Sequence, residues 1–451
     1  MPEAKDINDS LEFLRYFEKY SVPHDLAGLV QEKIRHGERA LDLTGSRLQE
    51  EDFRILGGIE PLQNLKWLNL SETGLTSAGL KHLCFSGIFS GLERLGLANN
   101  NLDDEGIFYL TKSPHLGRVV ELDLSCNEIG SLGAKVLGLA NQLGRLEMLD
   151  LSHNRLEPLG IQSLSASPVL SRIRHLNLRD TSIGDEGVQH LAGAPSLGQL
   201  ETLDLSDNSL KAGSLQTLSR SSGDLKNLKR LVLTNNHLGD EGVQALAQSA
   251  VFSGLEELVL EFNGLTADSA IFIAESKTLG RLKILNLNNN CLQAEGIQVL
   301  TRSPNMEWVE DLDVGENNLG VEGARALAGG PYFANVVRLR LNNNGITDAG
   351  AAAIAQSKTL TRMRELYLEK DNWIHAEGSR ALAESPSLAT LKKLVLTLNM
   401  IGDEGARHLA QSQTLGTLES LNVAGNRLSP IGENSLRNSQ TLVNLKTLEL
   451  V

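Results

Sequence analysis

The chain has 451 residues, of which 41% are hydrophobic and 4% aromatic, and its formal net charge is −14. Binding to nucleic acid or anionic lipid needs clustered lysine and arginine, so this acidic balance excludes both as expected partners and favours a basic or mixed-charge protein. The cysteines Cys84, Cys126 and Cys291 are too scattered for a disulfide framework or a structural zinc site. This cysteine usage predicts a reducing, cytoplasmic compartment.

Residues 1–37 precede the periodic part of the chain. The segments "NDSLEFLRYFEKY" and "HDLAGLVQEKIRHG" each place apolar residues on one face of a helix, with Ser10 as a candidate N-cap. We expect an N-terminal helical cap at 1–37 that covers the apolar edge of the first coil, and a separate recruiting module is the alternative. The first residues lack the features of a secretory signal, and no apolar run approaches the ~20 residues that a membrane helix needs. We therefore expect a soluble protein.

A repeat occupies residues 38–451. The pattern L-x-x-L-x-L-x-x-N-x-L recurs every 27 residues, with a spacing of 28 after Leu200 and after Met363. The repeats start at Glu38, Leu65, Leu92, Val119, Leu146, Ile173, Leu200, Leu228, Leu255, Leu282, Val309, Val336, Met363, Leu391, Leu418 and Leu445. A fixed period of this length predicts one solenoid of about 15 full repeats plus a terminal strand, in place of several globular domains.

Each repeat predicts one short strand and one short helix. Leucines at positions 4 and 6, such as Leu203 and Leu205, alternate as in a half-buried strand, and the Asn at position 9 is expected to bond buried backbone groups. The second half, such as "GDEGVQALAQS", has helical periodicity and acidic residues in its first turn. Strands pack more closely than helices, so the stack must curve. We predict an α/β, right-handed, horseshoe-shaped solenoid with parallel strands on the concave face and helices on the convex face.

The eight-residue unit "LDLSDNSL" (203–210), together with helices of the "LGDEGVQALA" type, resembles the ribonuclease-inhibitor-like leucine-rich repeat proteins. The resemblance covers residues 38–451 and departs in its 27-residue period, which is nearer to bacterial and F-box-type repeats such as "ITDAGAAAIA" (346–355). It implies a non-catalytic protein-interaction scaffold that binds its partner on the concave face. The same superfamily includes the Ran GTPase-activating protein, so a signalling regulator of that kind is the alternative.

Acidic residues gather at position 5 on the expected concave face. Asp123, Asp150 and Asp204 share one line of the sheet, and Asp207 lies close by. Like charges in a row cost stability, so one interpretation is a footprint for a basic partner. The other is that short aspartates belong to a favoured "LDLS" unit.

Apolar residues predicted to be exposed form a second candidate surface. The members are Val232, Val259, Phe262 and Ile284 on consecutive repeats, and Tyr367, Trp373, Val395 and Leu398 around the second 28-residue repeat, with Arg338 and Arg340 between the two groups. Aromatic residues mixed with arginine are typical of an interface core and its rim. Isolated exposed apolar residues are also normal on any surface, which is the competing interpretation.

Catalysis is not expected. Cys126, His153 and Asp180 stand at position 8 of successive repeats, an order that could supply a nucleophile, a base and an orienting acid. The column is predicted to be exposed, with no oxyanion donors or pocket evident. The sequence also lacks the common catalytic motifs, and we expect no cofactor and no metal.

The last seven residues, "LKTLELV" (445–451), form a strand half-repeat without its helix. An open parallel edge normally needs a cover. We expect either a homodimer through this C-terminal edge or a natural chain that continues past Val451.

Overall fold

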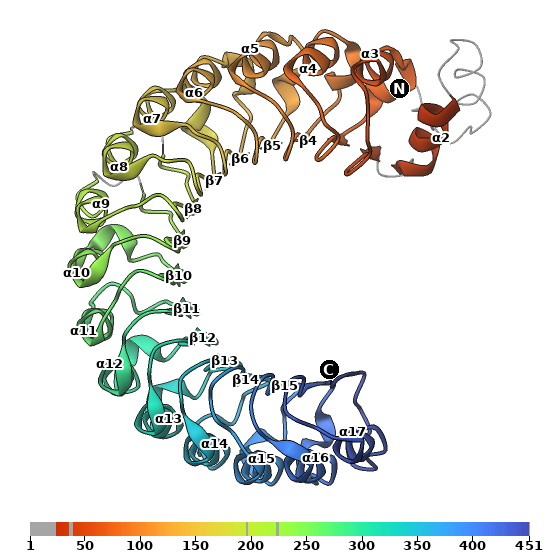
Figure 1. Ribbon diagram of the computed structural model, residues 1–451. Coiled ribbons are helices and arrows are strands. Elements are labelled where there is room, and N and C mark those ends of the chain that lie inside the picture. Colours follow the sequence, from red (N-terminus) through yellow and green to blue (C-terminus); the bar gives the residue numbers. More distant parts are fainter. Residues whose placement is uncertain (1–23, 36–38, 195–196, 222–224, 451) are drawn as a thin grey trace, which may run out of the picture. The chain divides into compact units, whose positions relative to one another are not determined.

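The computed structural model describes residues 24–35, 39–194, 197–221 and 225–450 (Figure 1). The contacts within the chain divide it into two compact units. The first unit comprises Met1–Ser209 and Ser221–Leu228, and the second comprises Leu210–Arg220 and Lys229–Val451. In each unit a three-residue strand alternates with a helix of about two turns. The predicted first helix lies outside the described residues.

The strands and helices of the first unit follow the predicted order. Its strands are β1 (Ile34–Arg35), β2 (Ala40–Asp42), β3 (Trp67–Asn69), β4 (Arg94–Gly96), β5 (Glu121–Asp123), β6 (Met148–Asp150), β7 (His175–Asn177) and β8 (Thr202–Asp204). Its helices are α2 (His24–Lys33), α3 (Glu50–Gly58), α4 (Ser77–Cys84), α5 (Asp104–Lys112), α6 (Ser131–Gly138), α7 (Glu157–Ser165) and α8 (Gly184–Ala192).

The second unit continues the same alternation. Its strands are β9 (Arg230–Val232), β10 (Glu257–Val259), β11 (Ile284–Asn286), β12 (Asp311–Asp313), β13 (Arg338–Arg340), β14 (Glu365–Tyr367), β15 (Lys393–Val395), β16 (Ser420–Asn422) and β17 (Thr447–Glu449). Its helices are α9 (Ala212–Leu218), α10 (Gly239–Gln248), α11 (Ala267–Glu275), α12 (Gln293–Leu300), α13 (Gly320–Gly329), α14 (Thr347–Ala355), α15 (Ala376–Ala383), α16 (Gly402–Ala410) and α17 (Pro430–Arg437). Short 3-10 turns, such as Pro386–Leu388, lead from several helices to the next strand.

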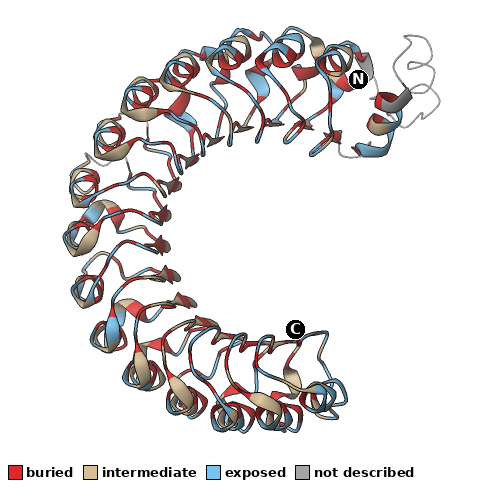
Figure 2. Ribbon diagram, in the orientation of Figure 1, coloured by how far each residue is buried: buried red, intermediate tan, exposed pale blue. Residues whose placement is uncertain are grey.

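Within each unit, neighbouring strands from β2 onward are parallel and keep one register, which places equivalent residues of successive repeats side by side. Leu122 of β5 stands opposite Leu149 of β6, and Leu258 of β10 stands opposite Leu285 of β11. These leucines are fully buried, and the buried residues lie between the strands and the inner sides of the helices (Figure 2). The α/β solenoid architecture predicted from the period is therefore confirmed.

The Asn at position 9 links successive repeats, as the sequence predicted. The Asn208 amide nitrogen donates to the carbonyls of Leu178 at 2.7 Å and Ser206 at 2.9 Å, while its oxygen accepts from the backbone N–H groups of Thr181 and Ile183. These bonds satisfy backbone groups that no strand ladder reaches. Because the pattern recurs along the chain, the turns after the strands have a fixed shape.

The helix predicted over 24–37 is shorter than expected. It ends at Lys33, and Ile34–Arg35 forms β1, which pairs antiparallel with β2 through Ile34 and Leu41. Ile34 is buried, as are Leu26 and Val30 of α2. An antiparallel partner satisfies the free backbone edge of the first repeat strand, which a continuing helix could not do. This edge pairing explains the early end of the helix.

Candidate functional site

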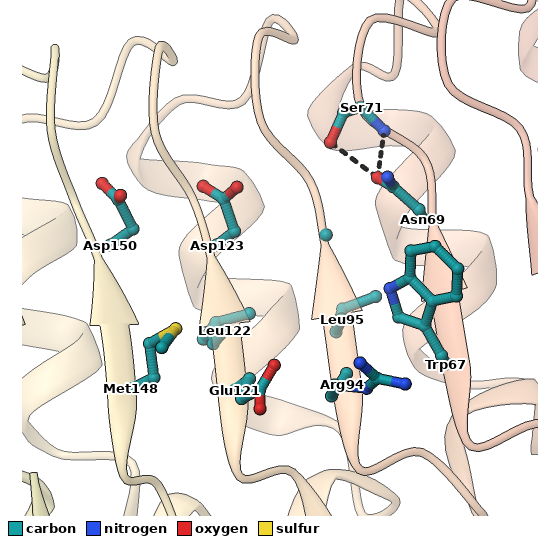
Figure 3. A pocket seen from close by; sticks show the side chains of 11 residues that line it. Trp67, Asn69, Ser71, Arg94, Leu95, Glu121, Leu122, Asp123, Met148 and Asp150 are labelled. Atoms are coloured by element: carbon teal, nitrogen blue, oxygen red, sulfur yellow. Dashed lines mark hydrogen bonds between the residues drawn. The ribbon is translucent and has the colours of Figure 1, made fainter. Parts of the chain in front are cut away.

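The strand face of the first unit carries a hollow of about 230 Å³ that crosses β3 to β6 (Figure 3). Two rows of side chains surround it: Trp67, Arg94, Glu121 and Met148 at position 3 of their repeats, and Asn69, Gly96, Asp123 and Asp150 at position 5. We call this site the Trp67 hollow. Leu95 and Leu122, both buried, also line it. The site thus combines an aromatic ring, a thioether and charges of both signs on an open sheet face.

Gly96 leaves room for the side chain of Asn69 at the edge of the hollow. A Cβ atom at this position would lie 2.5 Å from the side-chain oxygen of Asn69 and 3.4 Å from the hydroxyl of Ser71. That oxygen is fixed, because it accepts from both the N–H and the hydroxyl of Ser71, at 3.1 and 2.7 Å. Any residue larger than glycine would therefore collide with the Asn69 amide and disturb this turn.

Arg94 and Glu121 are register neighbours, yet they do not pair. The guanidinium of Arg94 instead lies over the Trp67 ring, 5.4 Å from its centroid, and Figure 3 shows it directed toward the indole. Within the described parts of the chain, Glu121 has no ion-pair partner within 4.0 Å. The equivalent neighbours Arg230 and Glu257 of the second unit pair at 2.7 Å. Glu121 is consequently a half-buried carboxylate without a cation.

The aspartates at position 5 have a local structural role. One carboxylate oxygen of each accepts from the N–H and the hydroxyl of the serine two residues later, at 2.9 and 2.7 Å for Asp123 and at 2.9 and 2.6 Å for both Asp150 and Asp204. This turn explains the "LDLS" spelling. The second oxygen of Asp150 accepts from Asn177 at 2.8 Å, which separates Asp150 from the next aspartate in the row.

The predicted acidic surface is partly neutralised within the chain. Asp207 pairs with Arg179 at 2.8 Å, and Glu201 pairs with Arg174. Asp123 and Asp150 belong to the Trp67 hollow, whereas Asp204 and Asp207 do not line it. The four predicted acidic residues therefore do not form one site.

The predicted apolar surface of the second unit is only partly exposed. Phe262, Trp373 and Leu398 are 51–54% exposed, and Ile284 and Tyr367 are half-buried. The expectation of exposure is wrong for Val232, Val259 and Val395, which are 5–8% exposed. Position 5 of one strand lies against position 5 of the next, and a short branched side chain there is covered by its neighbours, as Val259 is beside Val232.

Arg338 and Arg340 were predicted at the rim of an interface, but both guanidinium groups already form ion pairs within the chain. Arg338 donates to Glu365 at 2.7 and 2.8 Å and to Asp311 at 2.7 Å, and Arg340 donates to Asp311 at 2.7 Å. Tyr367 adds a hydrogen bond of 2.8 Å to Glu365. Hydrogen bonds from Arg338 lower the pKa of the Glu365 carboxyl to about 2. This network is a structural ladder across β12, β13 and β14.

The turn after each strand imposes an unusual backbone. Position 8 has a positive φ in successive repeats, including Asn235 (54°), Phe262 (54°), Asn289 (52°) and Leu398 (57°). Asparagine tolerates this left-handed conformation, whereas a bulky apolar residue does so at a cost of roughly 1 kcal/mol. Phe262 and Leu398 are therefore strained as well as exposed.

The column of Cys126, His153 and Asp180 is assembled only in part. His153 Nδ1 lies 3.0 Å from Asp180 Oδ2, and both residues line a shallow cavity that does not include Cys126. Burial raises the pKa of the Cys126 thiol, and the negative charges of neighbouring aspartates raise it further. A protonated thiol is a poor nucleophile, so the geometry offers no support for a cysteine-based reaction.

Among residues that the structure describes, no cluster of histidine, cysteine, aspartate and glutamate could hold a metal ion. None of the helices formed by these described residues is long and apolar enough to span a membrane.

Sequence reasoning missed the Trp67 hollow. Its signal was present, because Trp67 and Arg94 occupy position 3 of adjacent repeats and Gly96 leaves position 5 empty beside them. The prediction concentrated on rows of similar residues, whereas a hollow depends on an isolated missing side chain.

The family model described as Leucine Rich repeat matches eight segments, at residues 119–138, 146–165, 172–192, 224–247, 282–300, 305–328, 334–355 and 387–410. No curated protein matches the chain significantly.

Among solved structures, the chain is similar to a leucine-rich repeat protein of Leptospira interrogans, with 21% identity, coverage of 94% of this chain and 98% of that one, and a TM-score of 0.48. An internalin of Listeria monocytogenes has 16% identity, coverage of 94% and 93%, and a TM-score of 0.44. A chain in the yeast Rad7 and Elc1 complex has 13% identity, coverage of 97% and 95%, and a TM-score of 0.47. Similarities at this level carry no argument about function. The 27-residue period, the parallel strands alternating with helices and the matched repeats together show that the chain has the α/β solenoid fold of leucine-rich repeats.

Proposed function

We propose that this protein is a non-catalytic scaffold that binds a partner protein on the strand face of its repeats. The observation that carries the proposal is the Trp67 hollow. An aromatic ring, an arginine and a 40% exposed methionine gather there around an open depression. These residue types are enriched at protein interfaces, and a strand face presents them on a rigid support.

The partner is a basic or mixed-charge protein. Glu121, Asp123 and Asp150 contribute three carboxylates to the hollow, against the single cation of Arg94. Asp204 lies further along the same face and adds to its negative potential. Such a surface steers a cationic partner toward the binding site.

Exposed apolar side chains on the second unit supply a further contact region. Phe262 and Leu398 hold strained backbone conformations, and Trp373 is 54% exposed with a positive φ of 56°. Strain that the fold tolerates at exposed apolar residues supports a binding role for them. Half-buried Ile284 and Tyr367 extend this region.

A site-specific cross-linking experiment tests the scaffold. A photoreactive amino acid replaces Met148 or Phe262 on the strand side, or exposed Lys135 on helix α6 as the matched control. We expect one protein of the source cells to cross-link from the strand-side positions and not from Lys135. Cross-linking of that protein from Lys135 alone would contradict a strand-face scaffold.

The finer assignments are part of the same proposal. We place the chain in the ribonuclease-inhibitor-like type and in the cytoplasm. The alternative, a regulator like the Ran GTPase-activating protein, predicts faster GTP hydrolysis by purified small GTPases, whereas the scaffold leaves that rate unchanged. The homodimer expected through the C-terminal edge stays a prediction, which light scattering on the purified chain tests.

A further inference from the structure

We propose that the Trp67 hollow is a binding site for a single arginine side chain that a partner protein inserts between Glu121 and Asp123. This inference rests on the proposed scaffold function and specifies what its strand face recognises. Three properties of the hollow carry it: a carboxylate that lacks a cation, a second carboxylate on the same strand, and apolar walls.

The missing cation is the first property. Two other charged pairs at position 3 do form ion pairs between register neighbours, Arg230 with Glu257 at 2.7 Å and Arg338 with Glu365 at 2.7 Å. Glu121 has Arg94 as its neighbour on one side and Met148 on the other. Arg94 is committed to the Trp67 ring, and Met148 is uncharged. Glu121 is therefore available to a cation from outside.

A second carboxylate is the second property. Asp123 stands beside Gly96 in the position 5 row, on the same strand as Glu121 and two residues further along it. Ser125 engages Oδ1 of Asp123, and in the described parts of the chain Oδ2 accepts no hydrogen bond. A group that enters the hollow thus meets two carboxylates, Glu121 at position 3 and Asp123 at position 5. The planar fork of a guanidinium presents donors along two edges and suits this arrangement better than a compact ammonium.

The apolar walls are the third property. The Trp67 indole and the Met148 thioether line opposite ends of the hollow, as Figure 3 shows, and both suit the methylene stem of a long cationic side chain. The volume of about 230 Å³ is below the range of ~300–1,000 Å³ typical of small-molecule sites. One side chain fits this volume better than a complete small ligand.

The charge balance of the hollow favours a positively charged side chain as the bound group. Glu121, Asp123 and Asp150 oppose Arg94, so the lining has an excess of negative charge before anything binds. An acidic or phosphorylated side chain would meet this excess unfavourably. An apolar side chain would cover Glu121 without pairing it, at the cost of its hydration.

The test follows the indole N–H resonance of Trp67 in the full-length protein labelled with ¹⁵N-tryptophan. Trp67→Phe assigns this resonance against those of Trp308 and Trp373, both exposed and remote in sequence. The probe is the capped peptide Gly-Arg-Gly. Matched probes are Gly-citrulline-Gly, which keeps the shape without the charge, and Gly-Lys-Gly, which keeps the charge without the fork.

We expect a saturable shift of the Trp67 resonance with the arginine peptide, and binding at least roughly tenfold weaker with the citrulline peptide. Glu121→Gln should weaken arginine binding by roughly fivefold, the effect of losing one partly exposed ion pair. Asp204→Asn, on the same face outside the hollow, should leave the affinity unchanged. Added salt should weaken binding of the arginine peptide and not that of citrulline.

Equal binding of the citrulline peptide, or an unchanged affinity in Glu121→Gln, would overturn the proposal. Equal binding of the lysine peptide would overturn the assignment to arginine. Equal shifts of all three indole resonances would also count against it, because they would report non-specific association. If the arginine proposal fails and the scaffold function holds, the partner should still cross-link from Phe262. The two proposals can therefore be tested separately.

Discussion

Arg338 on β13 holds Glu365 on β14 through two parallel hydrogen bonds, from Nε at 2.7 Å and from Nη2 at 2.8 Å. The third contact of the same guanidinium, to Asp311 on β12, joins three successive strands. These are charge-assisted bonds between partly buried groups, which are stronger than surface ion pairs. The relationship explains why a strand face rich in charge remains ordered.

Arg338→Leu should lower the free energy of unfolding by roughly 2 kcal/mol at neutral pH, because two carboxylates lose their shared cation. Arg230→Leu is the matched control, since Arg230 makes one such ion pair and is 41% exposed, and it should cost less than about 1 kcal/mol. Urea unfolding followed by circular dichroism measures both. Equal losses in the two variants would contradict a special role for the ladder.

The same pair predicts a pH dependence. The pKa of Glu365 is about 2 in the folded chain, below its ordinary value of 4.5, so the folded state binds fewer protons than the unfolded state between these values. The stabilisation is complete above pH 4.5 and is lost as the pH falls toward 2. The difference in stability between the wild-type chain and Arg338→Leu should therefore shrink in acid.

Asp313 has the opposite behaviour. Burial raises the pKa of its carboxyl to about 6, with small further increases from Glu261 and Asp311, although Gly315 N–H donates to it at 3.0 Å and Arg340 lies 3.8 Å away. The folded state therefore binds more protons than the unfolded state between about pH 4 and pH 6. Ionisation of this group costs stability as the pH rises through that window.

Asp313→Asn should stabilise the protein at pH 7.5 by up to roughly 2 kcal/mol, and the gain should vanish at pH 4. Asparagine keeps the acceptor for the turn, as Asn286 does for the N–H of Asn288 at 2.8 Å. Asp150→Asn reports the effect of the same exchange at the same position of another repeat. Thermal unfolding of both variants at pH 7.5 and pH 4 measures the gain in stability. A gain for Asp313→Asn that persists at pH 4 would show that it does not come from the titration of Asp313.

Some helices are capped by a side chain of the preceding repeat. Asp348 in the first turn of α14 accepts from the backbone N–H of His375 at 2.7 Å and of Gly378 at 2.9 Å, at the start of α15. A Cβ atom at Gly378 would lie 2.5 Å from the same carboxylate, so glycine is needed for this approach. The sequence predicted that acidic residues in the first turn of a helix stabilise the start of that same helix. Asp348 instead caps the helix of the next repeat.

Asp348→Ala should cost about 1 kcal/mol, as loss of an N-cap does, and should increase hydrogen exchange in α15 more than in α14. Asp348→Asn keeps an acceptor and should lose less. Exchange measured by mass spectrometry distinguishes the two helices. Faster exchange confined to α14 would contradict capping across repeats.

Properties that recur in every repeat could be predicted from the sequence. Leu203 and Asn208 stand at fixed positions of a constant period, and their burial and bonding follow from it. Properties that depend on which residues become neighbours could not. Val232 is buried because Val259 lies beside it, and Arg94 leaves Glu121 without a partner because Trp67 lies on its other side. Which of two neighbours a side chain contacts differs from repeat to repeat, so the periodic sequence pattern does not predict it.

Phe262 is the sharpest test of the binding surface on the second unit. Its φ of 54° matches those of Asn235 and Asn289 at the same position, and its ring is 51% exposed. Asparagine accepts the left-handed conformation more readily, so Phe262→Asn should raise the free energy of unfolding by about 1 kcal/mol. Asn289→Phe, the reverse exchange, should lower it by a similar amount.

If Phe262 contacts a partner, the stabilised variant should nevertheless lose cross-linking from the neighbouring strand face. Urea midpoints for both variants, together with cross-linking yields from a photoreactive residue at Ile284, measure the two effects. A stabilised variant with undiminished cross-linking would remove Phe262 from the interface, and an unchanged midpoint would show that packing of the ring offsets the backbone strain.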